Sequence, residues 1–177
     1  MQIAVIVGSL RKASLNRHLA ERLEALLPSG VTFKYVSVDL PLFNQDIENN
    51  APQSVKDAKA IVDESDGVLI VTPEYNRSLS GVLKNAIDWL SRPYGQNSWK
   101  GKPVASAGVS GGSLGTAPAQ QHLRSIMVYL EAIIMGQPEM YVVNGHSFHE
   151  DGSLTEKSQV YFQSFIDAFI AHIKKNQ

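Results

Sequence analysis

The chain has 177 residues, of which 44% are hydrophobic and 19% charged, and its formal net charge is -1 at pH 7. This length is typical of one domain with one core, so we expect a single domain over residues 1–177. The balanced charge offers no basic surface for nucleic acid, and the absence of cysteine excludes disulfides, iron–sulfur ligation and thiolate nucleophiles. Because the sequence opens without a signal-peptide pattern and contains no apolar run near the roughly 20 residues that span a bilayer, we expect a cytoplasmic protein with no membrane partner.

Apolar runs rich in valine and isoleucine predict five β-strands. These runs cover residues 3–7, 31–38, 67–72, 104–109 and 140–143. The central runs do not alternate apolar and polar residues, as a strand with one solvent-exposed face would. Continuous apolar runs are typical of strands buried on both faces of a parallel sheet.

Helical spacing of apolar residues appears between these runs and after the last one. The apolar faces lie within residues 15–27, 55–62, 82–90, 123–130 and 162–173. A strand that alternates with a helix five times predicts an α/β domain, with a mostly parallel sheet covered by helices on both faces and right-handed crossovers.

Three loops follow the first, third and fourth predicted strands, at residues 8–16, 72–80 and 109–116. In open parallel sheets the ligand binds outside the carboxyl ends of the strands, where the strand order reverses. We therefore expect these three loops to form the functional site.

The first loop, GSLRKASLN, offers the hydroxyls of Ser9 and Ser14, the guanidinium of Arg11, the amide of Asn16 and the N-terminus of the next helix. Helix N-termini favour anions because their first N–H groups are unpaired. A terminal phosphate monoester fits this loop. The alternative is that Ser14 only caps the helix while Arg11 lies in solvent.

Other phosphate sites are excluded by residue type. The loop lacks the second glycine and the Lys-Ser pair of a Walker loop, and it lacks the GxGxxG pattern of a dinucleotide fold. A tyrosine phosphatase of low molecular weight needs a cysteine, and a receiver domain needs acidic residues after its first strand. This chain has neither.

The second loop, TPEYNRSLSG at residues 72–81, is stiffened by Pro73, and a new helix is expected near Ser80. The third loop, GVSGGSLGTAP at residues 108–118, carries four glycines, which would let backbone N–H groups approach a planar ligand. The alternative for the third loop is an ordinary flexible turn.

Together, GSLRKASLN, TPEYNRSLSGVLKNAIDW and SGGSLGTAPAQQHLR resemble the NADPH-dependent FMN reductase family, which includes flavodoxin-like quinone and chromate reductases and azoreductases. The resemblance covers nearly the whole chain. It implies a doubly wound, flavodoxin-like fold with a five-stranded parallel sheet in the order 2-1-3-4-5.

The resemblance also implies the residues that bind FMN. Those matching the phosphate site are Ser9, Arg11, Ser14, Leu15 and Asn16, those matching the ring site are Pro73, Glu74, Tyr75 and Asn76, and those expected near the N1 and O2 atoms of the ring are Ser110, Gly111 and Gly112. No side chain is expected to act as a catalytic acid, base or nucleophile, because the cofactor carries the chemistry.

The activity implied by the resemblance is transfer of a hydride from NADPH or NADH to FMN, followed by reduction of a quinone, an azo compound or a metal oxyanion such as chromate in a ping-pong cycle. Thr116-Ala117-Pro118 replaces a glycine-and-arginine stretch of some chromate-reducing relatives, which leaves chromate preference and tetramer contacts open. The alternatives are a flavodoxin-type electron carrier or a flavin-binding sensor. A strongly acidic surface is usual in such carriers and is absent here.

A homodimer or homotetramer is implied as well, with helix 80–91 packing against the helix of Arg124 and Tyr129 across the interface. The residues alone also permit a simple Lys84–Asp88 pair on a solvated surface. Two histidines and two carboxylates in HSFHED, residues 146–151, lie between turn signals, and we expect no metal there.

Overall fold

The computed structural model describes residues 1–149 and 151–177. The strands are β1 (Gln2–Val7), β2 (Thr32–Val36), β3 (Gly67–Val71), β4 (Pro103–Ser110), β5 (Ile133–Ile134) and β6 (Met140–Val143). The helices are α1 (Leu15–Glu24), α2 (Gln53–Glu64), α3 (Gly81–Leu90), α4 (Ala117–Tyr129) and α5 (Glu156–Lys175), with a 3₁₀-helix η1 at Gln45–Asn50.

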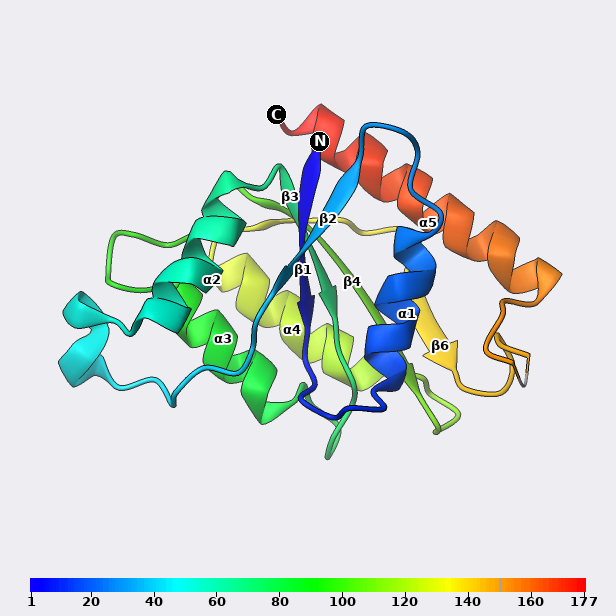
Figure 1. Cartoon of the computed structure of the whole chain (residues 1–177), viewed down its shortest axis with the longest axis horizontal. Coiled ribbons are helices and arrows are strands. Elements are labelled where there is room, and N and C mark those ends of the chain that lie inside the picture. The colour runs from blue at the N-terminus through cyan, green and yellow to red at the C-terminus, as the bar shows by residue number, and fades with distance from the viewer. Residues whose placement is uncertain (150) are drawn as a thin grey trace.

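The strands form one parallel sheet in the order β2-β1-β3-β4-β5, with β6 also paired to β4 (Figure 1). The predicted parallel sheet and strand order are therefore confirmed, with β6 as the fifth predicted strand. The short strand β5 was not predicted. It pairs with Pro103 and Val104 at the start of β4, whereas β6 pairs with residues 107–110 at its end, so the position beside β4 is shared by two short strands.

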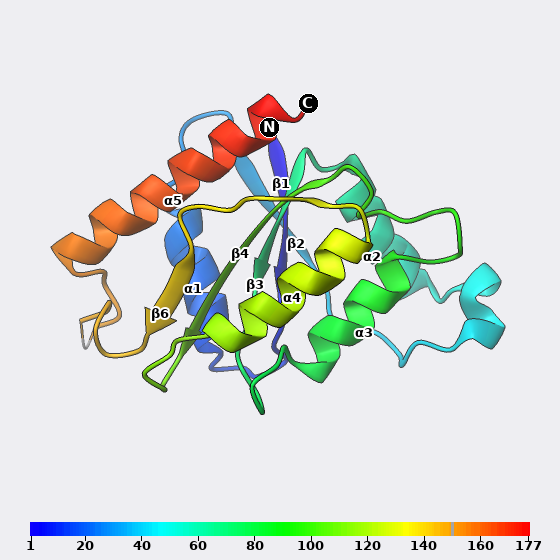
Figure 2. The ribbon, with the colours of Figure 1, turned by 180° about the vertical axis from the view of Figure 1, so that it is seen from behind.

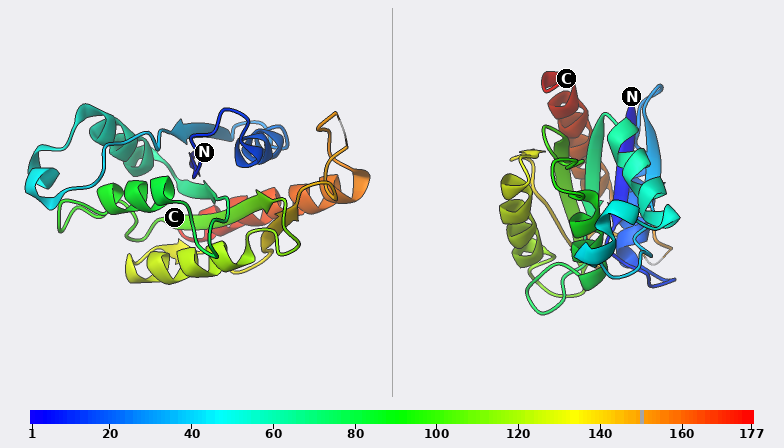
Figure 3. Two further views of the ribbon diagram at one scale, coloured as in Figure 1. Left: turned by 90° about the horizontal axis from the view of Figure 1, so that it is seen from below. Right: turned by 90° about the vertical axis from the view of Figure 1, so that its left-hand side faces the viewer.

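The sheet is covered on both faces, as Figure 3 shows from two further directions. Alternate residues of β1 point to opposite faces. Ile3 and Val5 pack in the cluster that α1 and α5 cover, while Ala4 and Ile6 pack in the cluster that α2, α3 and α4 cover. Because both faces are buried, the strands have the continuous apolar runs seen in the sequence.

The carboxyl ends of β1, β3 and β4 meet at one edge of the sheet, the lower edge in Figure 1. Hydroxyl side chains cap two of the helices that begin there, α1 and α3. Ser14 accepts the Arg17 N–H at 3.2 Å at the start of α1, and Ser80 accepts the Leu83 N–H at 3.3 Å at the start of α3. The expected helix start near Ser80 is confirmed.

Candidate functional site

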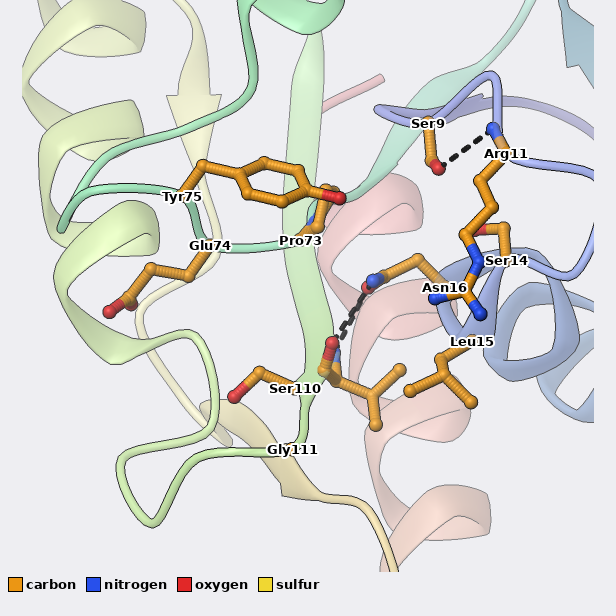
Figure 4. Close-up of a pocket in the computed structure, with 11 residues that line it drawn as sticks. Ser9, Arg11, Ser14, Leu15, Asn16, Pro73, Glu74, Tyr75, Ser110 and Gly111 are labelled. Atoms are coloured by element: carbon orange, nitrogen blue, oxygen red, sulfur yellow. Dashed lines mark hydrogen bonds between the residues drawn. The ribbon is translucent and has the colours of Figure 1, made fainter.

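One pocket lies at this edge and encloses about 170 Å³. It is lined by every residue predicted for the cofactor except Asn76 and Gly112 (Figure 4). Val109 also lines it and was missed in the sequence, although its place at the end of a predicted strand was a usable signal.

The phosphate loop, residues 8–16, presents hydrogen-bond donors to this pocket. The backbone N–H groups of residues 12–16 have no protein acceptor in the described part of the chain. Ser14 is 3% exposed and caps α1, as the alternative reading predicted, yet its hydroxyl proton remains available to a ligand. The Arg11 side chain lies along the same wall in Figure 4. This donor set fits a bound phosphate.

Asn16 lines the pocket, but its amide group is engaged by the protein. The side-chain N–H of Asn16 donates to the Val109 carbonyl, and the side-chain oxygen accepts the Val109 N–H, each at 3.0 Å. The side chain is buried, and this pair ties the start of α1 to the end of β4. The amide that the sequence offered to a phosphate is therefore used to join two walls of the pocket.

The second loop forms a tight hairpin. Tyr75 and Ser78 exchange two backbone hydrogen bonds of 3.0 and 2.9 Å, and the two residues between them, Asn76 and Arg77, have φ values of 51° and 63°. Positive φ at both central positions is the type I′ arrangement that fits the twist of a hairpin. Asn76 lies at the tip of this hairpin rather than in the pocket lining.

Glu74 points away from the pocket and fastens this hairpin to α4 (Figure 4). Its Oε2 atom accepts the Ala119 N–H at 3.2 Å, and its Oε1 atom lies 3.4 Å from Arg77 Nη1. A carboxylate at a helix N-terminus is stabilised by the unpaired N–H groups and the helix dipole. The backbone N–H of Glu74 has no acceptor within residues 1–149 and 151–177, so the main chain of this lining residue can donate a hydrogen bond to a ligand.

The glycines of the third loop have two different functions. A Cβ at Gly108, inside β4, would overlap Thr116 and the Thr72 carbonyl, and a Cβ at Gly115 would lie 2.9 Å from the Tyr141 backbone. These two glycines therefore allow close internal packing, and neither lines the pocket. At Gly111 no described atom lies within 4 Å of the Cβ position, and its N–H has no acceptor in residues 1–149 and 151–177.

The residues described contain no cluster of three or more histidine, aspartate or glutamate side chains placed to bind a metal ion. Glu150 of the HSFHED segment lies outside the described residues. None of the described helices has the length and hydrophobicity needed to cross a membrane.

Fold and pocket together define a doubly wound α/β protein with a pocket at the carboxyl edge of its sheet, where the available hydrogen-bond donors fit a phosphate. A family model for NADPH-dependent FMN reductases matches residues 1–147. The chain belongs to this family, and the resemblance drawn from the three loops is confirmed. FMN and NAD(P)H are the cofactors of the family, and the unpaired donors of the phosphate loop and of Gly111 fit a phosphorylated, planar ligand.

Two relatives match over nearly their whole length. A 2-hydroxy-1,4-benzoquinone reductase of a Burkholderia species is 46% identical over 98% of this chain and 97% of its own, and a quinone reductase of Pseudomonas putida is 47% identical over 99% and 96%. Among solved structures, the flavoenzyme NAD(P)H:(acceptor) oxidoreductase FerB of Paracoccus denitrificans has a TM-score of 0.93 and 45% identity, covering 99% of this chain and 98% of its own.

Proposed function

We propose that this protein is an NAD(P)H-dependent quinone reductase that works through FMN bound at the carboxyl edge of the sheet. The observation that carries the proposal is the pocket in which Arg11 and the unpaired N–H groups of the phosphate loop face Pro73, Tyr75 and Gly111. The names of the two relatives, both reductases of quinones, support a quinone as the acceptor.

The residues divide into two groups in this proposal. Ser9, Arg11, Ser14 and the N-terminus of α1 would hold the phosphate, because charge-assisted hydrogen bonds to a phosphate are stronger than neutral ones. The main-chain N–H groups of Glu74 and Gly111, with Gly112 beside them, would donate to the polar edge of the ring and stabilise negative charge there. Tyr75, 57% exposed, would form the outer wall.

FMN, when bound, takes a hydride from NAD(P)H and passes both electrons to the acceptor. The chain would bind NAD(P)H and the acceptor in turn on the same open side of the pocket, which predicts ping-pong kinetics. Azo compounds and metal oxyanions such as chromate are further acceptors under this proposal, because an open pocket discriminates weakly between acceptors.

The test is an anaerobic absorbance scan of the protein reconstituted with FMN and mixed with NADPH and NADH in separate samples. Loss of the flavin band, restored by a quinone, is the expected result, and initial rates at several fixed quinone concentrations should give parallel double-reciprocal lines. A bound flavin that neither nucleotide reduces would contradict the proposal and identify an electron carrier or a sensor instead.

A second copy of the chain is the proposed partner. Helices α3 and α4 lie side by side in Figure 2 and flank a groove of about 400 Å³. Tyr129 beside it is 84% exposed and Val128 is 69% exposed, which favours this face as the dimer interface that the family resemblance implies. Lys84 and Asp88 form the intrahelical pair at 2.8 Å, and Arg124 donates to the Met135 carbonyl at 3.0 Å, so Arg124 is engaged within its own chain.

A further inference from the structure

A second pocket adjoins the cofactor pocket on the side of β2. It encloses about 320 Å³ between the phosphate loop and the end of β2, and it shares Ser9 and Arg11 with the cofactor pocket. Its other polar side chains come from Arg17, Tyr35 and Ser37, and Val36 and Val38 supply apolar surface. The proposed function leaves this pocket without an occupant.

Two contacts orient the Arg17 side chain beside this pocket. Its Nε donates to Glu21 Oε1 at 2.9 Å, and its guanidinium carbon lies 3.8 Å from the centre of the Tyr35 ring. The Tyr35 hydroxyl in turn donates to Glu24 Oε2 at 2.8 Å. The stacking and the ion pair define the position of the Arg17 side chain.

The terminal nitrogens of Arg17 remain available to a ligand. In the part of the chain that the structure describes, only Nε of this side chain has a hydrogen-bond partner. No carboxylate lines the pocket, and Asp39, just after Val38, is not among its walls. Burial, and then the hydrogen bond to Glu24, raise the pKa of Tyr35, so the phenol stays neutral and the charge of the pocket comes from Arg11 and Arg17.

An anion with an attached apolar group fits this arrangement, since the two arginines lie beside the valine side chains at the end of β2. In doubly wound dinucleotide-binding folds, the end of the second strand is where the 2′ substituent of the adenosine ribose is read, by an acid for the hydroxyl or by an arginine for the phosphate. This pocket shares Ser9 and Arg11 with the cofactor pocket, so a nucleotide phosphate bound here would lie next to bound FMN.

We propose that this second pocket binds the 2′-phosphate of NADPH, with Arg17 as the residue that favours NADPH over NADH. The inference rests on the proposed function, because it assigns a substrate to the same site. Arg11, shared by the two pockets, then lies between the phosphate of the cofactor and that of the substrate.

The kinetic test compares NADPH and NADH with the holoenzyme and three variants. Arg17→Gln removes the cation, and Ser37→Asp adds a carboxylate to the pocket while keeping an acceptor for the Asp39 N–H, which Ser37 now accepts at 3.2 Å. Both variants should raise the KM for NADPH roughly tenfold or more and leave the KM for NADH within about twofold. Arg17→Gln removes a charged hydrogen-bond donor to the phosphate, and Ser37→Asp places a negative charge beside it. Arg22→Ala, an equal loss of charge on α1 outside this pocket, should change neither KM.

The second measurement is calorimetric binding of 2′,5′-ADP and of 5′-AMP to the FMN-loaded protein without turnover. Tighter binding of 2′,5′-ADP, lost in Arg17→Gln, is expected. The subsite would be overturned if the protein bound the two nucleotides equally, or if the variants changed the KM for NADPH and the KM for NADH equally. It would also be overturned if the apoprotein bound FAD more tightly than FMN, because the pocket would then belong to the flavin cofactor. The proposed function is tested separately by flavin reduction with NADH. If NADH reduces the flavin in every variant, the proposed function stands whether or not the subsite does. If neither nucleotide reduces the flavin, the proposed function fails and the calorimetry alone decides the subsite.

Discussion

Asn16 and Val109 are joined by two hydrogen bonds of 3.0 Å, in which one side-chain amide satisfies both backbone groups of a residue 93 positions away. The first of these residues lies in the first turn of α1 and the second lies near the end of β4, so the pair holds the phosphate loop against the third loop. This relationship makes Asn16 a positioning residue for the pocket.

Replacing Asn16 with alanine should therefore destabilise the apoprotein. The change leaves the buried N–H and carbonyl of Val109 without partners, which we expect to lower the free energy of unfolding by about 2–4 kcal/mol. Urea denaturation followed by circular dichroism measures it. Asn49→Ala, at an exposed asparagine of η1, is the matched control and should lie within about 0.5 kcal/mol of the wild type. An equal stability for both variants would show that the pair contributes nothing.

Arg11→Ala should weaken FMN binding by roughly 1.5–3 kcal/mol, the range for hydrogen bonds to charged groups. Lys12→Ala provides the comparison, because Lys12 is an exposed cation of the same loop that does not line the pocket. Flavin fluorescence titration of the two apoproteins gives both dissociation constants. If the Arg11 variant binds FMN as tightly as the wild type, Arg11 does not hold the phosphate.

Arg77→Gly should stabilise the protein. Arg77 has a φ of 63°, where a Cβ is unfavourable by about 1–2 kcal/mol and glycine is not. The ion pair with Glu74 that would be lost is exposed at Arg77 and contributes little. We expect the midpoint of urea unfolding to rise for Arg77→Gly, whereas Arg77→Ala, which removes the charge but keeps the Cβ, should show no rise. A rise of equal size in both variants would mean that charge, not backbone conformation, is responsible.

Tyr129→Glu should separate the proposed dimer, because it replaces the most exposed aromatic side chain of α4 with a charge beside the groove. Size-exclusion chromatography with light scattering should give twice the chain mass for the wild type and the mass of one chain for the variant. Val160→Glu, at an exposed valine of α5 on the opposite face of the sheet, should remain dimeric. A wild-type protein with the mass of one chain would rule the interface out.

The order of strands and helices could be predicted from the sequence because strands buried on both faces need continuous apolar runs, and Ile3–Val7 and Gly67–Val71 show them directly. The location of the site followed from the same order, since parallel strands bring their carboxyl ends to one edge. The strand β5 could not be predicted, because two residues are too few for a periodic pattern and their strand geometry depends on pairing with the first residues of β4, beside the stretch that β6 pairs with.

The sequence by itself determined the fold, the family and the residue types at the cofactor pocket, because these depend on local hydrophobic spacing and on loops that follow strands. The tertiary structure decided what each side chain does there. It commits the Asn16 amide to Val109, turns Glu74 towards α4 and stacks Arg17 on Tyr35. Hydrogen bonds and stacking between residues far apart in the chain form only where the fold brings those residues together in space. A local sequence pattern does not contain that information.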